Sequence, residues 1–111
     1  MGEGILDGIK VLDVASFIAA PAAGTVMADF GADVVKAELP GTGDGLRNFP
    51  PFKDGKSVWW KAANRNKKGV LFDYRGDDRD KIEMLISQAD VIFVDAEASG
   101  IDISYKTVKR L

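Results

Sequence analysis

The first forty residues alternate between strand and helix signals in an order that allows few folds. Residues 10–14 form a short apolar run with β-branched side chains, which predicts a buried strand. Pro21 lies where a helix can begin, because its missing N–H costs nothing there. Gly31 suits the left-handed position that ends a helix, and residues 33–38 predict a second strand. A strand, a helix and a strand within about thirty residues indicate a right-handed parallel crossover.

The helix between these strands has apolar side chains at helical spacing. We expect them to form the face that packs on the sheet: Ala22, Ala23, Val26, Met27 and Phe30. Residues 39–57 are rich in Pro and Gly and predict a long irregular loop, which in compact domains tends to be functional or mobile. Residues 58–63 predict one or two helical turns under that loop.

The second half of the chain repeats the strand and helix signals. Residues 68–73 predict a third strand, and Asp77 is the expected N-cap of a helix with the apolar stripe Ile82, Leu85 and Ile86. Residues 89–94 predict a fully buried fourth strand, and residues 104–111 a short helix. The chain of 111 residues fits one domain of the α/β class. The expected fold is an open parallel sheet in the order β-α-β-loop-β-α-β, with ligands at the carboxyl ends of the strands.

The absence of two residue types limits the chemistry of the chain. It has neither cysteine nor histidine, which excludes a disulfide framework, thiolate metal sites and Ser-His-Asp hydrolysis within these residues. A net charge of −2 gives no overall basic field for nucleic acid. The longest apolar stretch, residues 15–23, is too short to span a membrane, and the N-terminus lacks the positive charge of a signal peptide. We therefore expect a cytoplasmic protein without nucleic-acid or membrane partners.

Two charged runs suggest binding chemistry. Five cations lie within fifteen residues: Lys61, Arg65, Lys67, Lys68 and Arg75. With the nearby amides they suit phosphate groups, whereas most charge runs are simply solvated faces, and both interpretations stay open. The acidic run from Asp77 to Asp80 suits a helix start better than a metal site, because acids there complement the helix dipole. We expect no metal.

Three ordered segments resemble the class III CoA transferases, the CaiB/BaiF-type family that also includes alpha-methylacyl-CoA racemases. The first segment spans residues 7–13, 19–21 and 28–36. The second is residues 64–68 with a strand that ends at Asp73, and the third is residues 89–92. The spacing is consistent over residues 6–111, so the chain resembles the N-terminal segment of such an enzyme.

The resemblance implies a Rossmann-like large domain, of which residues 1–111 form the N-terminal part without a second domain. It implies transfer of CoA between carboxylic acids through an aspartate that forms an acyl-enzyme anhydride, or epimerisation of acyl-CoA thioesters in the racemases. Those catalytic groups lie further along the longer family chains, so we expect no catalytic residue and no transfer activity in this chain alone. CoA enters as a substrate, with no cofactor, and a full-length relative is expected to be a homodimer. The alternative is a non-catalytic remnant or scaffolding domain of the same fold.

The resemblance also implies which residues contact CoA. They follow the predicted strands: Ser16, Phe17, Ile18, Leu39, Phe72, Arg75 and Asp95. Leu39 stands where some members have an arginine, and Asp95 and Ala96 stand where most have Asn-Phe. These departures point either to weaker CoA binding or to a subfamily, and both interpretations stay open.

Four strands and only two clear helices predict incomplete cover of the sheet. A parallel sheet needs cover on both faces. We therefore expect the isolated chain to self-associate or to have marginal stability.

Overall fold

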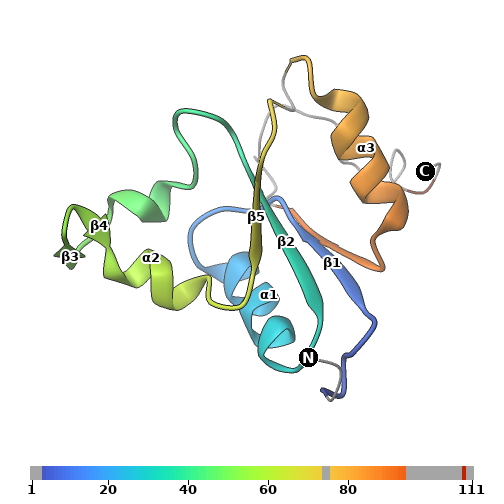
Figure 1. The fold of residues 1–111 in the computed structure, drawn as a ribbon, viewed down its shortest axis with the longest axis horizontal. Coiled ribbons are helices and arrows are strands. Elements are labelled where there is room, and N and C mark those ends of the chain that lie inside the picture. Colours follow the sequence, from blue (N-terminus) through green and yellow to red (C-terminus); the bar gives the residue numbers. More distant parts are fainter. Residues whose placement is uncertain (1–3, 74–75, 95–108, 110–111) are drawn as a thin grey trace.

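The computed structural model describes residues 4–73, 76–94 and 109, and its centre is a four-stranded parallel sheet (Figure 1). The strands are β1 (Lys10–Asp13), β2 (Asp33–Glu38), β5 (Lys68–Leu71) and β6 (Val91–Phe93), in the order β5-β2-β1-β6. All three pairings are parallel. The predicted α/β class with a Rossmann-like open parallel sheet is therefore confirmed.

Helix α1 (Ala19–Asp29) connects β1 to β2 and begins two residues earlier than predicted. Pro21 lies in its first turn rather than at its first position. This is tolerated because the N–H groups of a first turn have no acceptor within the helix. Gly31 follows the helix with a φ of 104°, the left-handed conformation expected of a residue that ends a helix.

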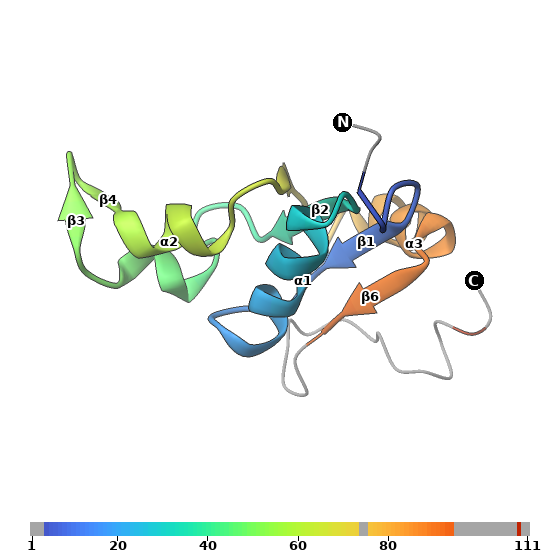
Figure 2. The same cartoon turned by 90° about the horizontal axis from the view of Figure 1, so that it is seen from below.

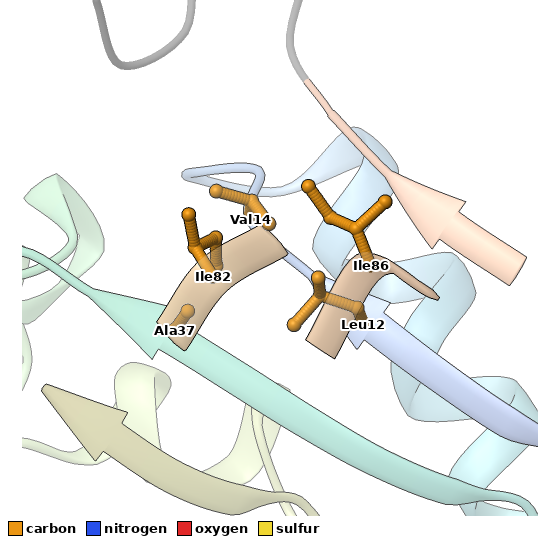
Figure 3. Packing of buried hydrophobic residues seen from close by; sticks show 5 residues of the cluster. All are labelled: Leu12, Val14, Ala37, Ile82 and Ile86. Atoms are coloured by element: carbon orange, nitrogen blue, oxygen red, sulfur yellow. The ribbon is translucent and has the colours of Figure 1, made fainter. Parts of the chain in front are cut away.

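The alternation of side chains along the strands gives the sheet two different faces. Val11 and Val34 point to one face and pack with Ala28 of α1 and Ala32. Leu12, Val14 and Ala37 point to the other face, where they pack against Ile82 and Ile86 of helix α3 (Arg79–Gln88), as Figure 3 shows. The predicted apolar stripe of α3 is confirmed, and its two isoleucines close the core on that face.

The expected packing face of α1 is mostly wrong: of the five predicted residues only Met27 packs against the α1-side core. The buried residues of this helix are Pro21, Gly24, Thr25 and Ala28, whereas Val26 and Phe30 are about half exposed. A Cβ atom on Gly24 would lie 3.6 Å from both the Asp13 carboxylate and the Lys67 side chain. The sheet carries charged side chains on this face, and the small face of the helix packs over them.

Residues 45–63, here called the lobe, project to one side of the sheet beside α1 (Figures 1 and 2). The lobe contains the 3₁₀ helix η1 (Gly45–Asn48), the hairpin of β3 (Phe52–Lys53) and β4 (Lys56–Ser57), and helix α2 (Val58–Ala63). The predicted loop is thus partly ordered into short elements, and the predicted helical turns at 58–63 are confirmed. The Ser57 hydroxyl caps α2 by accepting a hydrogen bond from the Trp60 amide at 3.1 Å.

Three further predictions need correction. Strand β5 ends at Leu71, two residues early, and the N-cap of α3 is Asp78 rather than Asp77. Strand β6 is half-buried rather than fully buried, because it pairs only with β1 and is an edge of the described sheet. The helix predicted at 104–111 lies, apart from Lys109, outside the described residues. No helix in the described ranges is long and apolar enough to cross a membrane.

Helices α1 and α3 each cover one face over β1 and β2. Strand β5 remains largely exposed, with Leu71 65% exposed, so the cover of the described sheet is incomplete as predicted. Strands β5 and β6 are the edges of the described sheet. Self-association of the isolated chain stays a prediction.

Replacing Ile82 by alanine should destabilise the fold strongly. The Ile82 side chain is 1% exposed in the α3-side core, and truncating a buried isoleucine leaves a cavity that costs about 2–5 kcal/mol. Met84 lies on the same helix and is 54% exposed, so Met84→Ala should change the unfolding free energy by less than about 0.5 kcal/mol. Urea unfolding of both variants measures the difference, and equal losses would contradict the packing of α3.

Candidate functional site

A cluster of buried charges lies at the carboxyl ends of β1 and β2, on the face covered by α1. We call Asp13, Lys36, Asp44 and Lys67 the ionic cluster. The Lys67 ammonium lies 2.8 Å from Asp13 Oδ2, and the Lys36 ammonium lies 3.5 Å from Asp13 Oδ1 and 2.9 Å from Asp44 Oδ2. All four side chains are at most 3% exposed. Two carboxylates therefore balance two ammonium groups inside the protein.

Strand alternation explains why these charges meet. Asp13 and Lys36 are direct partners across β1 and β2, and both point to the α1 side. Lys67 comes from the segment before β5, and it also donates hydrogen bonds to the Pro21 carbonyl at 2.7 Å and to Asn64 Oδ1 at 2.9 Å. Lys36 donates to the Ala15 carbonyl. These contacts supply the hydrogen bonds that a buried charge requires.

Burial is the dominant influence on Lys67. It lowers the pKa of the Lys67 ammonium below its usual value, although the hydrogen bond and the negative charge of Asp13 act in the opposite direction. The Asp13 carboxylate is therefore the main group that keeps this cation charged inside the fold.

Asp44 ties together the loops that follow β1 and β2. Its Oδ1 atom accepts hydrogen bonds from the Phe17 amide at 3.0 Å and from the Leu46 amide at 2.9 Å. Its Oδ2 atom faces Lys36 as an ion pair without hydrogen-bond alignment. Phe17 has a φ of 64°, a left-handed conformation that is rare for a bulky residue and that occurs mainly where the surroundings hold it. Asp44 supplies that hold.

Glu38 anchors the lobe at the end of β2. Its carboxylate receives two parallel hydrogen bonds from Arg47, each 2.8 Å, and one from the Asp44 amide at 2.7 Å. The Arg47 guanidinium also lies over the Trp60 ring, 4.0 Å from its centre. Burial alone would raise the pKa of Glu38, but the hydrogen bonds from Arg47 and from the Asp44 amide outweigh it and lower that pKa. Glu38 therefore stays ionised and bound at neutral pH.

Three exposed aromatic rings form a continuous surface between the β1 loop and the lobe. We call Phe17, Phe49 and Trp59 the aromatic surface. The Phe17 and Phe49 rings meet edge to face at 5.5 Å, and the Phe49 and Trp59 rings at 6.1 Å. A Cβ atom on Gly45 would lie 2.7 Å from the Phe17 ring, so only glycine leaves room for it. A large rigid apolar surface beside buried charges is a common composition for a small-molecule site.

The structure places five of the seven predicted CoA contacts. Phe17 and Ile18 lie exposed in the β1 loop directly after Ser16, whereas Leu39 and Phe72 pack together against the core on the α3 side. Arg75 and Asp95 lie outside the described residues. The five placed residues all follow the carboxyl ends of β1, β2 and β5, but they divide between the two faces of the sheet.

The basic cluster is mostly engaged in ion pairs. Lys67 belongs to the ionic cluster, Arg65 pairs with Asp29 at 2.6 Å, and Lys68 pairs with Asp33 at 2.9 Å. These ion pairs favour the structural interpretation of the three cations, because each already has a carboxylate partner. Lys61 lines a separate hollow on the lobe.

The acidic run at the start of α3 has a structural use. Asp78 accepts a hydrogen bond from the Asp73 amide at 2.8 Å and pairs with Lys81 at 2.9 Å. The hydrogen bond from Lys81, together with the one from the Asp73 amide, lowers the pKa of Asp78. Over the ranges 4–73 and 76–94, no three carboxylates gather as a metal site would require.

Sequence reasoning missed Glu38, Asp44 and Arg47. All three depend on how the β2 loop folds back, which no local pattern shows. The one available signal is the pair of left-handed glycines that shape this loop, Gly41 with a φ of 83° and Gly43 with a φ of 63°.

Comparison with known proteins shows one consistent family. Residues 6–110 match the model of CoA-transferase family III. The chain is 36% identical over 89 residues to the succinyl-CoA–D-citramalate CoA-transferase of Chloroflexus aurantiacus, covering 78% of this chain and 22% of that protein. It is 32% identical over 111 residues to the human succinyl-CoA:glutarate CoA-transferase, covering 96% of this chain and 25% of that protein.

A solved structure agrees with the sequence comparison. The crystal structure of a CaiB/BaiF family protein from Brucella suis superposes with a TM-score of 0.85 at 32% identity, covering 96% of this chain and 30% of that one. The chain thus spans about a quarter of the length of the curated relatives described above.

Removing the Lys36 charge should destabilise the fold far more than removing an exposed one. Lys36→Met leaves Asp44 and part of Asp13 buried without a cation, and breaking a buried pair costs about 3–5 kcal/mol. Lys68→Met removes an exposed pair with Asp33 and should cost less than about 1 kcal/mol. Chemical denaturation at neutral pH compares the two, and similar values would contradict the burial of the ionic cluster.

The contribution of Glu38 to stability should disappear in acid. Because its pKa is lowered in the folded state, its stabilisation is complete above the usual glutamate value of 4.5 and is lost as the pH falls through the folded-state value. The difference in unfolding free energy between wild type and Glu38→Gln should therefore narrow as the pH falls below 4.5.

The matched control for that experiment is Glu83→Gln, which removes a carboxylate from an exposed pair with Arg79. Its effect should be small at every pH, because exposed pairs contribute little. A constant difference between wild type and Glu38→Gln from neutral to acid pH would show that Glu38 acts only by packing.

Proposed function

Because this chain belongs to CoA-transferase family III, we propose that it forms the CoA-thioester-binding edge of an enzyme that transfers CoA between carboxylic acids. The observation that carries the proposal is that three loops lie together along the side of the sheet formed by the carboxyl ends of its strands, which we call the CoA-binding edge. The loops after β1, β2 and β5 all leave the carboxyl ends of parallel strands. In open α/β sheets, ligands bind outside these ends.

The β1 loop offers the best-defined contact surface for the ligand. Phe17 and Ile18 are 45% and 47% exposed, although both are large and apolar. The hydrogen bond from the Phe17 amide to Asp44 fixes the loop before any ligand arrives. A preformed apolar surface reduces the ordering cost of binding, and it suits the CoA arm next to the thioester.

The remaining contacts keep the roles that the resemblance implies. Leu39 and Phe72 would receive the adenosine from the α3 side, where both remain partly exposed over the core. Arg75 would contact the adenosine and the phosphates together with Phe72, and Ser16 would lie near the CoA arm and the thioester. Asp95 would lie in the CoA pocket at the position where most members have Asn. All these roles are proposals for this chain.

The names of the relatives favour transfer over epimerisation, because those described above are CoA-transferases. We extend the proposal to a cytoplasmic enzyme whose full-length form is a homodimer, as the resemblance implies. The aspartate nucleophile of the reaction would belong to family sequence outside these 111 residues.

Titration of the chain with CoA tests the proposed edge. Amide chemical shifts should change for residues 14–18, 39–44 and 72–73, and the amides at the amino ends of the strands should not respond. Phe17→Ala should weaken CoA binding about tenfold, which corresponds to about 1.4 kcal/mol.

Phe30→Ala is the matched control for that variant. Phe30 is 51% exposed at the other end of α1, beside the amino ends of the strands, so its removal should leave CoA affinity unchanged. A thermal melt of each variant confirms that it is folded. Equal losses from the two substitutions, or shift changes at the amino ends of the strands, would reject the proposed edge.

A further inference from the structure

A hollow on the lobe carries positive charge that the CoA-binding edge does not use. It has a volume of about 300 Å³ and is lined by residues of η1, the β3–β4 hairpin and α2: Arg47, Gly55, Lys56, Ser57, Trp60 and Lys61. None of these belongs to the seven residues assigned to CoA. Its volume lies at the lower end of the range for small-molecule sites.

Three cations surround the hollow, and two of them have no carboxylate partner among the described residues. Arg47 is balanced by Glu38 through the two parallel hydrogen bonds. Lys56 and Lys61 form no ion pair with any residue in the described part of the chain, whereas Arg65, Lys67 and Lys68 each do. The hollow therefore has two ammonium groups in excess, next to a fixed guanidinium.

The backbone around the hollow is well defined, although the lysine side chains themselves are exposed. Asp54 and Gly55 form the tight turn of the hairpin with φ values of 52° and 75°, which places the backbone of Lys56 beside the hollow. Ser57 fixes the start of α2 through its cap on the Trp60 amide and through a hydrogen bond to the Phe49 carbonyl at 2.6 Å. Arg47 stacks over the Trp60 ring and so orients its guanidinium. The lining is built from short, mutually anchored elements.

From this geometry we propose that the hollow binds a phosphate monoester. Two ammonium groups and one oriented guanidinium match the double negative charge and the several acceptor oxygens of that group. A carboxylate carries only one charge and would leave one lysine unbalanced. Two sources share this chemistry: the 3′-phosphate of a nucleotide such as the head of CoA, which would then lie on the lobe rather than at Leu39 and Phe72, and a separate small phosphorylated molecule.

The test uses the 111-residue chain with inorganic phosphate and with adenosine 3′,5′-bisphosphate, at constant ionic strength. The readouts are the amide shifts of residues 47 and 55–61 and the indole N–H of Trp60. We expect saturable shifts with at least one of the two probes. Lys56→Gln combined with Lys61→Gln should weaken that binding at least about tenfold, since two charge-assisted contacts are lost.

Lys10→Gln combined with Lys53→Gln is the matched control. It removes two exposed lysines as well, one of them from the same hairpin, but neither lines the hollow. Its affinity for the probe should stay within about twofold of wild type if the site is local rather than a diffuse charge effect. The proposal is overturned if neither probe saturates, if potassium chloride gives the same shifts, or if both double variants lose affinity equally.

The two probes distinguish the two sources. Tighter binding of adenosine 3′,5′-bisphosphate than of phosphate, with displacement by CoA, assigns the hollow to a nucleotide. Equal binding of both probes, without displacement by CoA, assigns it to a separate phosphorylated molecule. The readouts at residues 14–18 report the CoA-binding edge independently, so either proposal can fail while the other stands.

Discussion

The buried carboxylate of Asp13 is the group on which the arrangement of this molecule depends. It lies between the ammonium groups of Lys36 and Lys67, which come from β2 and from the segment before β5. Burying a charge costs free energy unless the charge is paired and hydrogen-bonded. The packing of β1, β2 and the segment before β5 is therefore interdependent, because each contributes one of the three paired charges. Lys36 then faces Asp44, and through Asp44 the arrangement reaches the loops that carry the candidate site.

That chain of contacts explains why the proposed ligand surfaces lie where they do. Asp44 holds the Phe17 amide, and Glu38 holds Arg47, so two acids fix the β1 loop and the lobe to the sheet. The aromatic surface is formed by residues of the β1 loop and the lobe, and the hollow on the lobe is lined by Arg47 itself. The aromatic surface and the basic hollow are thus both attached to the same sheet through these two carboxylates.

The sequence predicts the sheet well, because strands follow from local periodicity. It predicts the site only in part, because the site depends on contacts between residues that are distant in the sequence. Strand positions and the stripe of α3 follow from local periodicity, so Leu12 and Ile82 were assigned to the core correctly. The packing face of α1 is mostly not the one that hydrophobicity favours, because Val26 is exposed and Gly24 lies over the buried Asp13 and Lys67 side chains. Asp44 and Arg47 could not be found, because their partners become neighbours only when the β2 loop folds back. The resemblance to a known family predicted the family correctly, and the CoA contacts that it implies stay predictions.

The cross-strand position of Asp13 and Lys36 also bears on how the sheet forms. In β1 and β2 these two residues stand directly opposite each other. If the strands slipped by one residue, the side chains of one strand would turn to the opposite face, and a charge would enter the layer of Leu12, Ile82 and Ile86 without a counter-ion. Parallel pairing joins distant segments and is slow to form, so misaligned encounters are frequent during folding. Burying an unpaired charge destabilises such a misaligned sheet, so the ion pair between Asp13 and Lys36 favours the observed register.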